Sequence, residues 1–348
     1  MGYHTWRMSR LSLSLLTKSL QVLSPLVHVI VVLSISEFKR NNLIMFNGII
    51  RELNALWEMS PHKHFIRNCI FLCVYGRLSL QFLCNATGSL FHTKRNTAVN
   101  QSIPYETSAT QTYTMNAAIH SMLPEDFPWS GRRLGRCAVV GSGGILKNSS
   151  CGREIDSADF VIRFNLALIN DSDVGLKTDL ITVNPTQIRR EFNNMEQNPD
   201  PLVERVSVYG NASLAIPAFA YTFCTGLSIR TLKVLHPIRP QQPVVFFSPI
   251  YLRTLDRLWK GRGLKSVRLS SGFLLINTAL ELCEDVHVYG FWPFDTDLQD
   301  NPIPYHYYDQ LRPHPYMHKM SEEFVRLLQL HSQGALTLHL QPCPSETH

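Results

Sequence analysis

Three histidines near the C-terminal end are the first candidates for chemistry: His306 in HYYD, and His314 and His318 in HPYMHKM. A neutral imidazole can remove a proton from a hydroxyl near neutral pH, or it can bind a metal ion. A zinc site needs a tight pair of ligands on one element, and this loop-like stretch offers none. From their spacing alone, His314 and His318 are expected on the surface, so a catalytic role needs support from elsewhere in the chain.

A glycine-rich turn is the second candidate. The segment CAVVGSGGILKNS places Gly141, Gly143 and Gly144 directly after an apolar run. Backbone N–H groups in such a turn can approach a phosphate, because glycine has no side chain to block it. The dinucleotide fingerprint would need glycine where Leu146 stands, and no Gly-Lys-Ser/Thr follows as in a P-loop. A phosphate-binding turn and a merely tight strand-to-helix turn both remain open.

Two Asp-x-Asp pairs, Asp171 with Asp173 and Asp295 with Asp297, raise the question of a metal. Many nucleotide-sugar enzymes hold a divalent ion with this pattern. The first pair lies within an Asn-Asp-Ser sequon and the second follows an expected strand, so we expect both pairs in solvated loops. We therefore predict no metal site.

The elements that must position these residues alternate from about Arg136 onward. Apolar runs predict strands in CAVV, DFVIRFN, TDLITVNP, VERVSVYG and PVVFFSP. Helical spacing predicts helices in LRTLDRLWKGRG, in SSGFLLINTALEL before a further strand, and from Ser321 to Gln333, with Ser321 as the expected cap. This alternation predicts an α/β fold with a doubly wound, mostly parallel sheet, whose ligands bind outside the C-terminal strand ends.

Composition narrows the class of protein. The chain has 348 residues with 33 Lys+Arg against 27 Asp+Glu, which is too mild and too dispersed a basic balance for nucleic-acid binding. Five Asn-X-Ser/Thr sequons indicate a lumenal chain. They lie at Asn85, Asn100, Asn148, Asn170 and Asn211.

The N-terminal part of the chain contains a possible membrane anchor. Residues 19 to 38 contain an apolar stretch preceded by Arg7, Arg10 and Lys18, and either a signal anchor or a buried helix fits it. We expect residues 1 to 84 to hold this segment and a stem, residues 85 to 130 to form an irregular lead-in, and residues 131 to 348 to form the catalytic domain.

Four segments together resemble the motifs of eukaryotic sialyltransferases. CAVVGSGGILKNSSCGREIDSADFVIRFN is similar to the large sialyl motif and RLSSGFLLINTALELCEDVHVYGFWPF to the small one. HYYD resembles the third motif, and His318 followed by Glu323 the very small motif, all in the family's order. CGREID, HYYD and FWPF resemble the alpha-2,8 branch most. The resemblance extends from about Cys84 to Cys343.

This resemblance implies a Rossmann-like, single catalytic domain that uses CMP-sialic acid as donor, needs no cofactor and inverts the sugar in one displacement. The implied acceptor is a terminal sialic acid on a glycolipid or glycoprotein, and the implied location is the Golgi membrane, as a single-pass type II protein with a lumenal catalytic domain. An alpha-2,3- or alpha-2,6-sialyltransferase, a catalytically silent sialoglycan-binding relative and a dinucleotide oxidoreductase are the alternatives.

The resemblance also assigns roles to residues. It implies His318 as general base and His306 as a partner of the donor phosphate. The residues implied to bind the donor are Ser142, Gly143, Asn165, Ser270, Ser271, Gly272 and Trp292. A core tryptophan is the alternative for Trp292. Two positions depart from the branch, because Ser142 stands where asparagine is usual and Phe164 where cysteine is common.

Cysteine pairing follows from the same resemblance. It implies disulfides Cys137–Cys283 and Cys151–Cys343, of which the second would tie the C-terminal tail to the donor loop. The remaining cysteines have no assigned partner; they are Cys69, Cys73, Cys84 and Cys224. We expect glycosylation at Asn85, Asn100 and Asn211.

Overall fold

The computed structural model describes residues 80, 84–108, 110–127, 129–130, 134–309 and 319–344. The proposed anchor at 19 to 38, His314 and His318 lie outside the described residues. Among the described residues, no helix is both long enough and apolar enough to cross a membrane.

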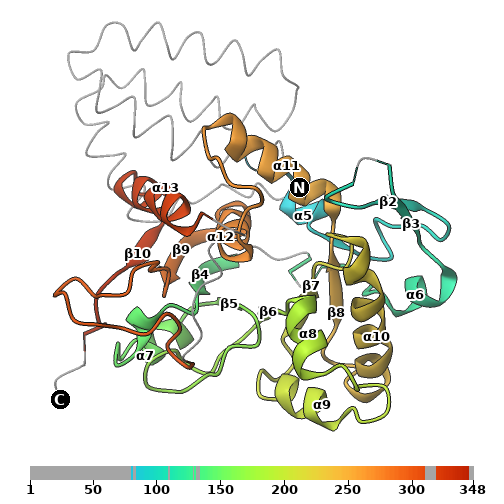
Figure 1. Ribbon diagram of the computed structural model, residues 1–348, viewed down its shortest axis with the longest axis horizontal. Coiled ribbons are helices and arrows are strands. Elements are labelled where there is room, and N and C mark those ends of the chain that lie inside the picture. The colour runs from blue at the N-terminus through green and yellow to red at the C-terminus, as the bar shows by residue number, and fades with distance from the viewer. Residues whose placement is uncertain are drawn as a thin grey trace, which may run out of the picture. The chain divides into compact units, whose positions relative to one another are not determined.

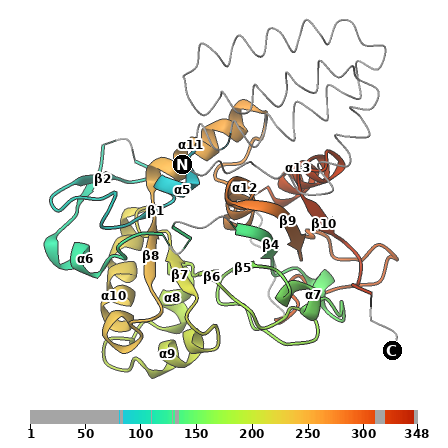
Figure 2. The same cartoon turned by 180° about the vertical axis from the view of Figure 1, so that it is seen from behind.

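An eight-stranded sheet forms the centre of the protein, in the order β1-β8-β7-β6-β5-β4-β9-β10 (Figures 1 and 2). Only the edge pair β1–β8 is antiparallel, and the other pairs are parallel. The strands are β1 (Phe91–His92), β4 (Leu134–Val140), β5 (Phe160–Arg163), β6 (Leu180–Thr182), β7 (Ser213–Ile216), β8 (Val244–Phe247), β9 (Cys283–Tyr289) and β10 (Thr337–His339). The predicted α/β fold with a mostly parallel, doubly wound sheet is confirmed.

Helices cover both faces of this sheet, which is why its inner strands are nearly continuous apolar runs. VVFF in β8 and LIT in β6 are buried at every position. The helices around the sheet are α5 (Ala86–Ser89), α6 (Ala117–Met122), α7 (Gly152–Asp156), α8 (Pro185–Glu191), α9 (Asp200–Ser207), α10 (Thr222–Ile238), α11 (Pro249–Gly261), α12 (Ser271–Leu282) and α13 (Met320–Ser332). A short 3-10 turn, Gly144–Leu146, follows β4.

Alternate side chains of one strand enter different apolar clusters. Val139 of β4 packs in the cluster that contains α11, α12 and α13, whereas Ala138 and Val140 pack in the cluster around α7. The helices α8, α9 and α10 lie together beside β7 and β8, and α12 and α13 lie together beside β9 and β10, as both views show (Figures 1 and 2).

Two expectations for local structure are wrong. VERVSVYG is not a strand, because its first residues belong to α9, in which Leu202 and Val206 are buried at helical spacing; the neighbouring strand is β7, formed by SLAI. The last helix begins at Met320 with Lys319 as N-cap, so Ser321 does not cap it.

Residues 85 to 130 differ from the expected irregular lead-in. Leu90 and Phe91 are completely buried, and Phe91 pairs with Phe247 in the central sheet. A hairpin of β2 (Ser102–Pro104) and β3 (Thr112–Thr114) follows. The polar composition of this segment reflects its loops, while its few apolar residues supply the buried contacts that make it part of the compact unit.

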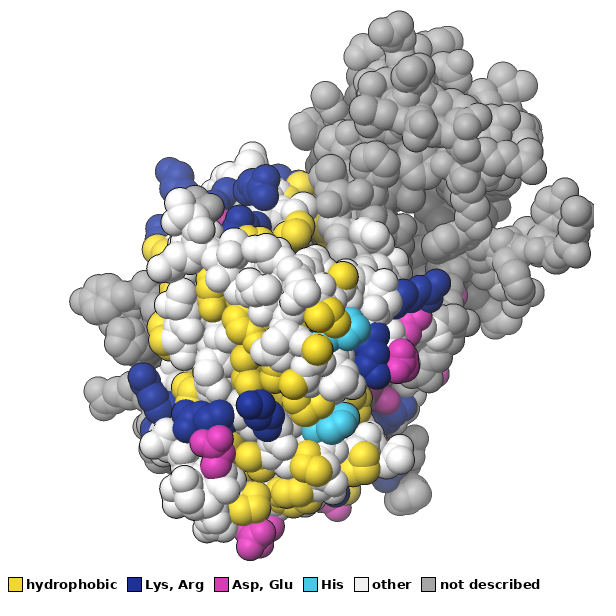
Figure 3. Space-filling view, turned by 90° about the vertical axis from the view of Figure 1, so that its right-hand side faces the viewer, with side chains coloured by type: hydrophobic (Ala, Val, Ile, Leu, Met, Phe, Trp, Pro, Cys, Tyr) yellow, Lys and Arg dark blue, Asp and Glu magenta, His cyan; other side chains and the backbone are white. Residues whose placement is uncertain are grey.

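The distribution of basic side chains on one face of the molecule can be compared with that of a nucleic-acid-binding surface. On the face shown in Figure 3, basic side chains lie as separate groups among apolar and uncharged ones, without a continuous basic area. Nucleic-acid binding depends on a dense basic footprint, and this face does not provide one.

Candidate active site

The strand order reverses between β4 and β9, and this is where an open α/β sheet forms its ligand crevice. From β4 the chain adds β5, β6, β7 and β8 on one side, and β9 and β10 on the other. The glycine turn follows β4 at Val140, and Gly290 follows β9 at Tyr289. The candidate site is therefore built around these two strand ends.

The glycine turn is defined by a close crossing of two backbones. Gly141 N–H donates to the Tyr289 carbonyl at 2.8 Å and Gly143 N–H to the Gly290 carbonyl at 2.9 Å. A Cβ on either Gly141 or Gly143 would lie 2.6 Å from the Gly290 oxygen. These two N–H groups serve the protein itself, so the glycines are required here by backbone approach.

The HYYD segment runs alongside this turn. Gly143 and His306 form an antiparallel bridge, and Tyr307 N–H donates to the Ser142 carbonyl at 3.0 Å. The Ser142 side chain makes a hydrogen bond with Tyr308. Segments about 160 residues apart in the sequence thus meet at the end of β4, with Ser142 half-buried between them.

His306 is oriented by a carboxylate. Its Nδ1 lies 3.0 Å and 3.1 Å from the two carboxylate oxygens of Asp309, and the Tyr308 ring stacks on it with centroids 5.3 Å apart. Because Asp309 accepts from Nδ1–H, Nε2 is left to face a ligand. Each of the two ion-pair side chains is 25% exposed, so the imidazole is supported yet accessible.

Asn165 occupies the neighbouring strand end. It follows β5 after Phe164 and has φ 53°, and Leu166 has φ 47°. Asparagine tolerates this left-handed conformation, but leucine rarely adopts it. Hydrogen bonds hold both residues, from Asn165 N–H to Thr182 Oγ1 and from Leu166 N–H to the Thr182 carbonyl, each at 3.2 Å. The half-buried Asn165 thereby lies at the same edge of the sheet as the glycine turn.

The start of α12 is joined to α13 by a buried carboxylate. Ser270 caps α12 by accepting from Phe273 N–H at 3.0 Å. Its own N–H donates to Glu323 Oε1 at 2.8 Å, and its hydroxyl donates to Oε2 at 2.5 Å. Burial raises the pKa of Glu323 to about 7. Ser270 is thus engaged within the protein, whereas Ser271 beside it is only half-buried.

Trp292 and Gly272 pack close to this junction. The Trp292 indole donates to the Thr296 carbonyl at 2.7 Å and packs edge-on against Phe294 and Phe324. A Cβ on Gly272 would lie 2.4 Å from the Phe291 ring. Trp292 is partly buried and packs against the apolar cluster that contains α12 and α13.

The two Asp-x-Asp pairs take part in loop hydrogen bonds. Asp173 accepts from Asn148 N–H at 2.9 Å and Ser150 N–H at 3.2 Å. Asp297 accepts from the Asn301 side-chain amide and from the backbone N–H groups of Asn301 and Gln299. These hydrogen bonds, the side-chain one foremost, lower the pKa of Asp297. One carboxylate of each pair, Asp173 or Asp297, thus shapes a turn.

Sequence comparison decides the family. The model of glycosyltransferase family 29 (sialyltransferase) matches residues 89–335. The chain belongs to this sialyltransferase family.

The chain is similar to several named sialyltransferases. Alpha-2,8-sialyltransferase 8E of Homo sapiens is 43% identical over 268 residues, covering 76% of this chain and 71% of the relative. Alpha-N-acetylneuraminide alpha-2,8-sialyltransferase of Bos taurus is 39% identical over 77% of this chain and 76% of its own length. Among solved structures, that of a mammalian sialyltransferase aligns with a TM-score of 0.44 and 25% identity, covering 60% of this chain and 70% of that one.

Both disulfides that the family resemblance implied are present in this sialyltransferase. Cys137–Cys283 links β4 to the start of β9, and Cys151–Cys343 links the start of α7 to the tail after β10. Among the described cysteines, Cys84 and Cys224 are free and buried. Burial raises the pKa of the Cys84 thiol to about 12.

The sequons of this sialyltransferase lie on its surface. All five asparagines are exposed, including Asn85, Asn100 and Asn211, where glycosylation is predicted. Exposure is a requirement for modification, so these positions remain predictions consistent with the structure.

The hydrogen-bond partners of two motif residues, His306 and Ser270, were not predicted from the sequence. Asp309 orients His306, and Glu323 satisfies Ser270 across 53 positions of sequence. The sequence placed both residues inside motifs, but nothing in it pointed to Ser270 as the partner of Glu323. A carboxylate three residues after a histidine is the only local signal for the first contact.

Proposed function

We propose that this sialyltransferase transfers sialic acid from CMP-sialic acid to a terminal sialic acid of a glycolipid or glycoprotein, forming an alpha-2,8 linkage. The observation that carries the proposal is the meeting of the glycine turn, Asn165 and His306 at the strand ends where the sheet order reverses. The linkage is supported by relatives of about 40% identity that are named for it.

The donor side of the reaction needs polar groups at the phosphate. As the bond between the sugar and CMP breaks, negative charge grows on the phosphate, and fixed hydrogen-bond donors stabilise it. We assign the imidazolium form of His306 to this contact, in which Nδ1–H donates to Asp309 and Nε2–H donates to the phosphate. The half-buried Ser142 and Asn165 flank the same edge, and Ser271 supplies an accessible hydroxyl at the start of α12.

The acceptor side needs a base. In a single displacement, the acceptor hydroxyl oxygen bonds to the anomeric carbon, CMP leaves with the bonding electrons, and the hydroxyl proton passes to the base, so the anomeric centre inverts. We assign His318 as this base. The helix α13, which follows His318 in the sequence, supports the assignment. Glu323 of α13 bonds to Ser270 at the start of α12, and Ser271 is the next residue.

The proposed setting is the Golgi lumen, with the chain anchored by its N-terminal segment. Two disulfides and five exposed sequons support a lumenal catalytic domain, because disulfides persist in oxidising compartments.

A transfer assay with labelled CMP-sialic acid tests the function. The full-length chain is offered matched sialylated and desialylated glycolipids and glycopeptides, and product linkages are determined by mass spectrometry and linkage-specific sialidases. The proposal predicts labelled products only from sialylated acceptors, with a new alpha-2,8 bond. Transfer to exposed galactose would instead identify an alpha-2,3 or alpha-2,6 enzyme.

His318→Ala provides the decisive variant in that assay. Loss of a general base is expected to reduce kcat by about 10² to 10⁴-fold. His236→Ala, which changes an exposed histidine on α10, is the matched control and should retain full activity. Equal activity of the two variants would refute His318 as base, and no transfer by the wild-type chain would refute the enzyme proposal.

A further inference from the structure

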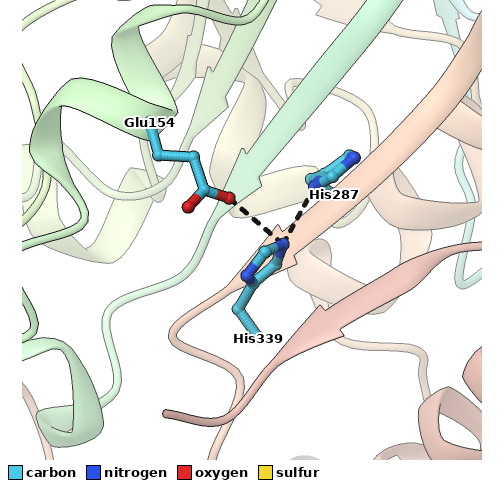
Figure 4. A group of neighbouring side chains, drawn as sticks. All are labelled: Glu154, His287 and His339. Carbon is cyan, nitrogen blue, oxygen red and sulfur yellow. Dashed lines mark hydrogen bonds and ion pairs between the residues drawn. The ribbon is translucent and has the colours of Figure 1, made fainter. Parts of the chain in front are cut away.

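A group of metal-ligating side chains lies apart from the donor-side residues, where α7, β9 and β10 meet. Glu154, His287 and His339 each offer one ligand atom, and these atoms all lie within 4.8 Å of one another. The three side chains converge from separate elements, with the His339 ring between the other two (Figure 4). All three are half-buried, so an ion could reach them and still be shielded.

The sheet itself brings these residues together. His287 and Tyr289 lie on the same face of β9, because side chains two apart along a strand point the same way. Strand β10 pairs in parallel with His339 beside Tyr289, and the rings of these two residues stack 4.1 Å apart. Glu154 comes from α7, which the Cys151–Cys343 disulfide holds to the tail following β10.

The separations suit a tetrahedral ion. His339 Nε2 lies 2.9 Å from His287 Nδ1 and 3.6 Å from Glu154 Oε1. Ligands at about 2.0 to 2.1 Å from a tetrahedral zinc ion lie about 3.3 Å from each other. These two separations bracket this value. The third, between the ligand atoms of His287 and Glu154, is at most 4.8 Å, so a shift of the Glu154 or His287 side chain would complete metal-binding geometry.

A second layer of hydrogen bonds orients two of the three ligands. Asp285 Oδ2 lies 3.1 Å from His287 Nε2, and a proton on that nitrogen leaves the Nδ1 lone pair directed at His339. Carboxylate–histidine pairs of this kind commonly support bound zinc. The Tyr289 hydroxyl donates to Glu154 Oε1 at 2.7 Å and so fixes the carboxylate.

We propose that Glu154, His287 and His339 bind one divalent transition-metal ion of the zinc class, with a fourth position left for water. The imidazole and carboxylate ligands are those that zinc accepts. The ion would join α7 to β9 and β10, and so secure the C-terminal strand on the sheet. This role is separate from sialyl transfer, because none of the three ligands is among the residues assigned to donor or acceptor.

Metal titration of the full-length chain tests the site. After chelator treatment and dialysis, Co²⁺ is added and its visible absorption is followed, then Zn²⁺ is added in competition. The proposal predicts one saturable equivalent with the strong absorption of four-coordinate Co²⁺, which Zn²⁺ abolishes. Zn²⁺ is also expected to raise the melting temperature, because an ion that binds only the folded state stabilises it.

Variants locate the ion. Glu154→Gln and His339→Gln should each remove the saturable equivalent, whereas the control His236→Gln on exposed α10 should retain it. Asp285→Asn should weaken affinity by about 10 to 100-fold while leaving one equivalent, since it changes only the support of His287.

Circular dichroism spectra of each variant establish that it is folded, and Glu154→Gln keeps the size and the acceptor oxygen that Tyr289 requires. The proposal is overturned if the wild-type chain shows no saturable equivalent, or if folded His339→Gln and Glu154→Gln both bind Co²⁺ as the wild type does. In that case the cluster is only the hydrogen-bonded chain Asp285–His287–His339.

Discussion

Two regions of the molecule position their side chains in opposite ways. One is the rim of the glycine turn, where Gly143 meets His306 and Asp309, and the other is the α12–α13 junction, where Ser270 meets Glu323. At the rim, backbone bonds fix the geometry, and the His306 and Asp309 side chains remain 25% exposed. At the junction, side chains fix the geometry, and Ser270 and Glu323 are 7% and 3% exposed. The first region keeps polar atoms for ligands, and the second uses them to hold two helices together.

This difference predicts that substitutions of the rim side chains affect activity more than stability, and that substitutions of the junction side chains do the reverse. An exposed polar side chain loses little on truncation, whereas a buried partner leaves unsatisfied groups behind. Four experiments can break or sharpen the comparison.

The largest effect is expected from His306→Ala. Loss of a donor aimed at the developing phosphate charge should reduce kcat by about 10² to 10³-fold, as in other sites of this kind. The melting temperature should change less than for a junction side chain, because His306 is 25% exposed and water can reach the groups that it leaves. Asp309→Asn should cause a smaller loss, since the imidazole remains. Steady-state kinetics with thermal unfolding checks both, and a large stability loss without a kinetic loss would reverse the assignment.

Gly143→Ala tests the backbone crossing. Its Cβ would lie 2.6 Å from the Gly290 carbonyl oxygen, so the two strand ends must separate. We expect a decrease of about 1 to 3 kcal/mol in the free energy of unfolding, together with weaker donor binding. The control is Gly226→Ala in α10, where a Cβ meets nothing within 4 Å and should stabilise the helix. Urea unfolding that gave equal results for both variants would contradict this account.

Glu323→Ala tests the junction. It removes the two carboxylate oxygens that accept from the buried Ser270, and each donor left unpaired costs about 1 to 3 kcal/mol. The free energy of unfolding should therefore fall by about 2 to 6 kcal/mol. Glu323→Gln keeps an acceptor for the Ser270 N–H and should lose less. Denaturant titration measures both. A neutral Glu323→Ala would mean that the two helices do not depend on this carboxylate.

The smallest effect is a pH dependence of stability. Burial raises the pKa of Glu323 to about 7 in the folded state, against an ordinary value of 4.5. The folded state therefore keeps a proton that the unfolded state releases, and this contribution is present below pH 4.5 and lost as pH rises to about 7. Glu281, whose pKa is also raised to about 7, acts in the same direction.

The wild-type free energy of unfolding, measured between pH 4.5 and 8, should therefore fall more steeply than that of Glu323→Gln, with the difference confined to the range below about pH 7. Glu281 is unchanged in both proteins, so it cancels in this comparison. Parallel curves would show that Glu323 does not titrate in that range.

Apolar runs predicted the interior of the fold because the inner parallel strands are buried on both faces. Such runs form the strands β4, β5, β6, β8 and β9. The prediction failed for α9, whose valines read as a strand although Leu202 and Val206 are buried at helical spacing. It also missed β1, because a two-residue edge strand has no periodic pattern.

Motif resemblance predicted the two disulfide pairs, but not the non-covalent contacts between side chains. Cys137–Cys283 and Cys151–Cys343 were implied correctly. The contact between Ser270 and Glu323, and the cluster of Glu154, His287 and His339, depend on the folded positions of distant segments. No local spacing signals such contacts, so only the structure reveals them.

Equilibrium binding of CMP tests the central claim most directly, namely that the nucleotide phosphate binds where the glycine turn meets His306. Isothermal titration calorimetry compares the wild type with His306→Ala and with Glu323→Gln, which leaves the rim unchanged. We predict at least about tenfold weaker binding for His306→Ala, because a hydrogen bond to a charged group contributes about 1.5 to 3 kcal/mol. Glu323→Gln should bind as the wild type does. Unchanged affinity in a folded His306→Ala would contradict the account.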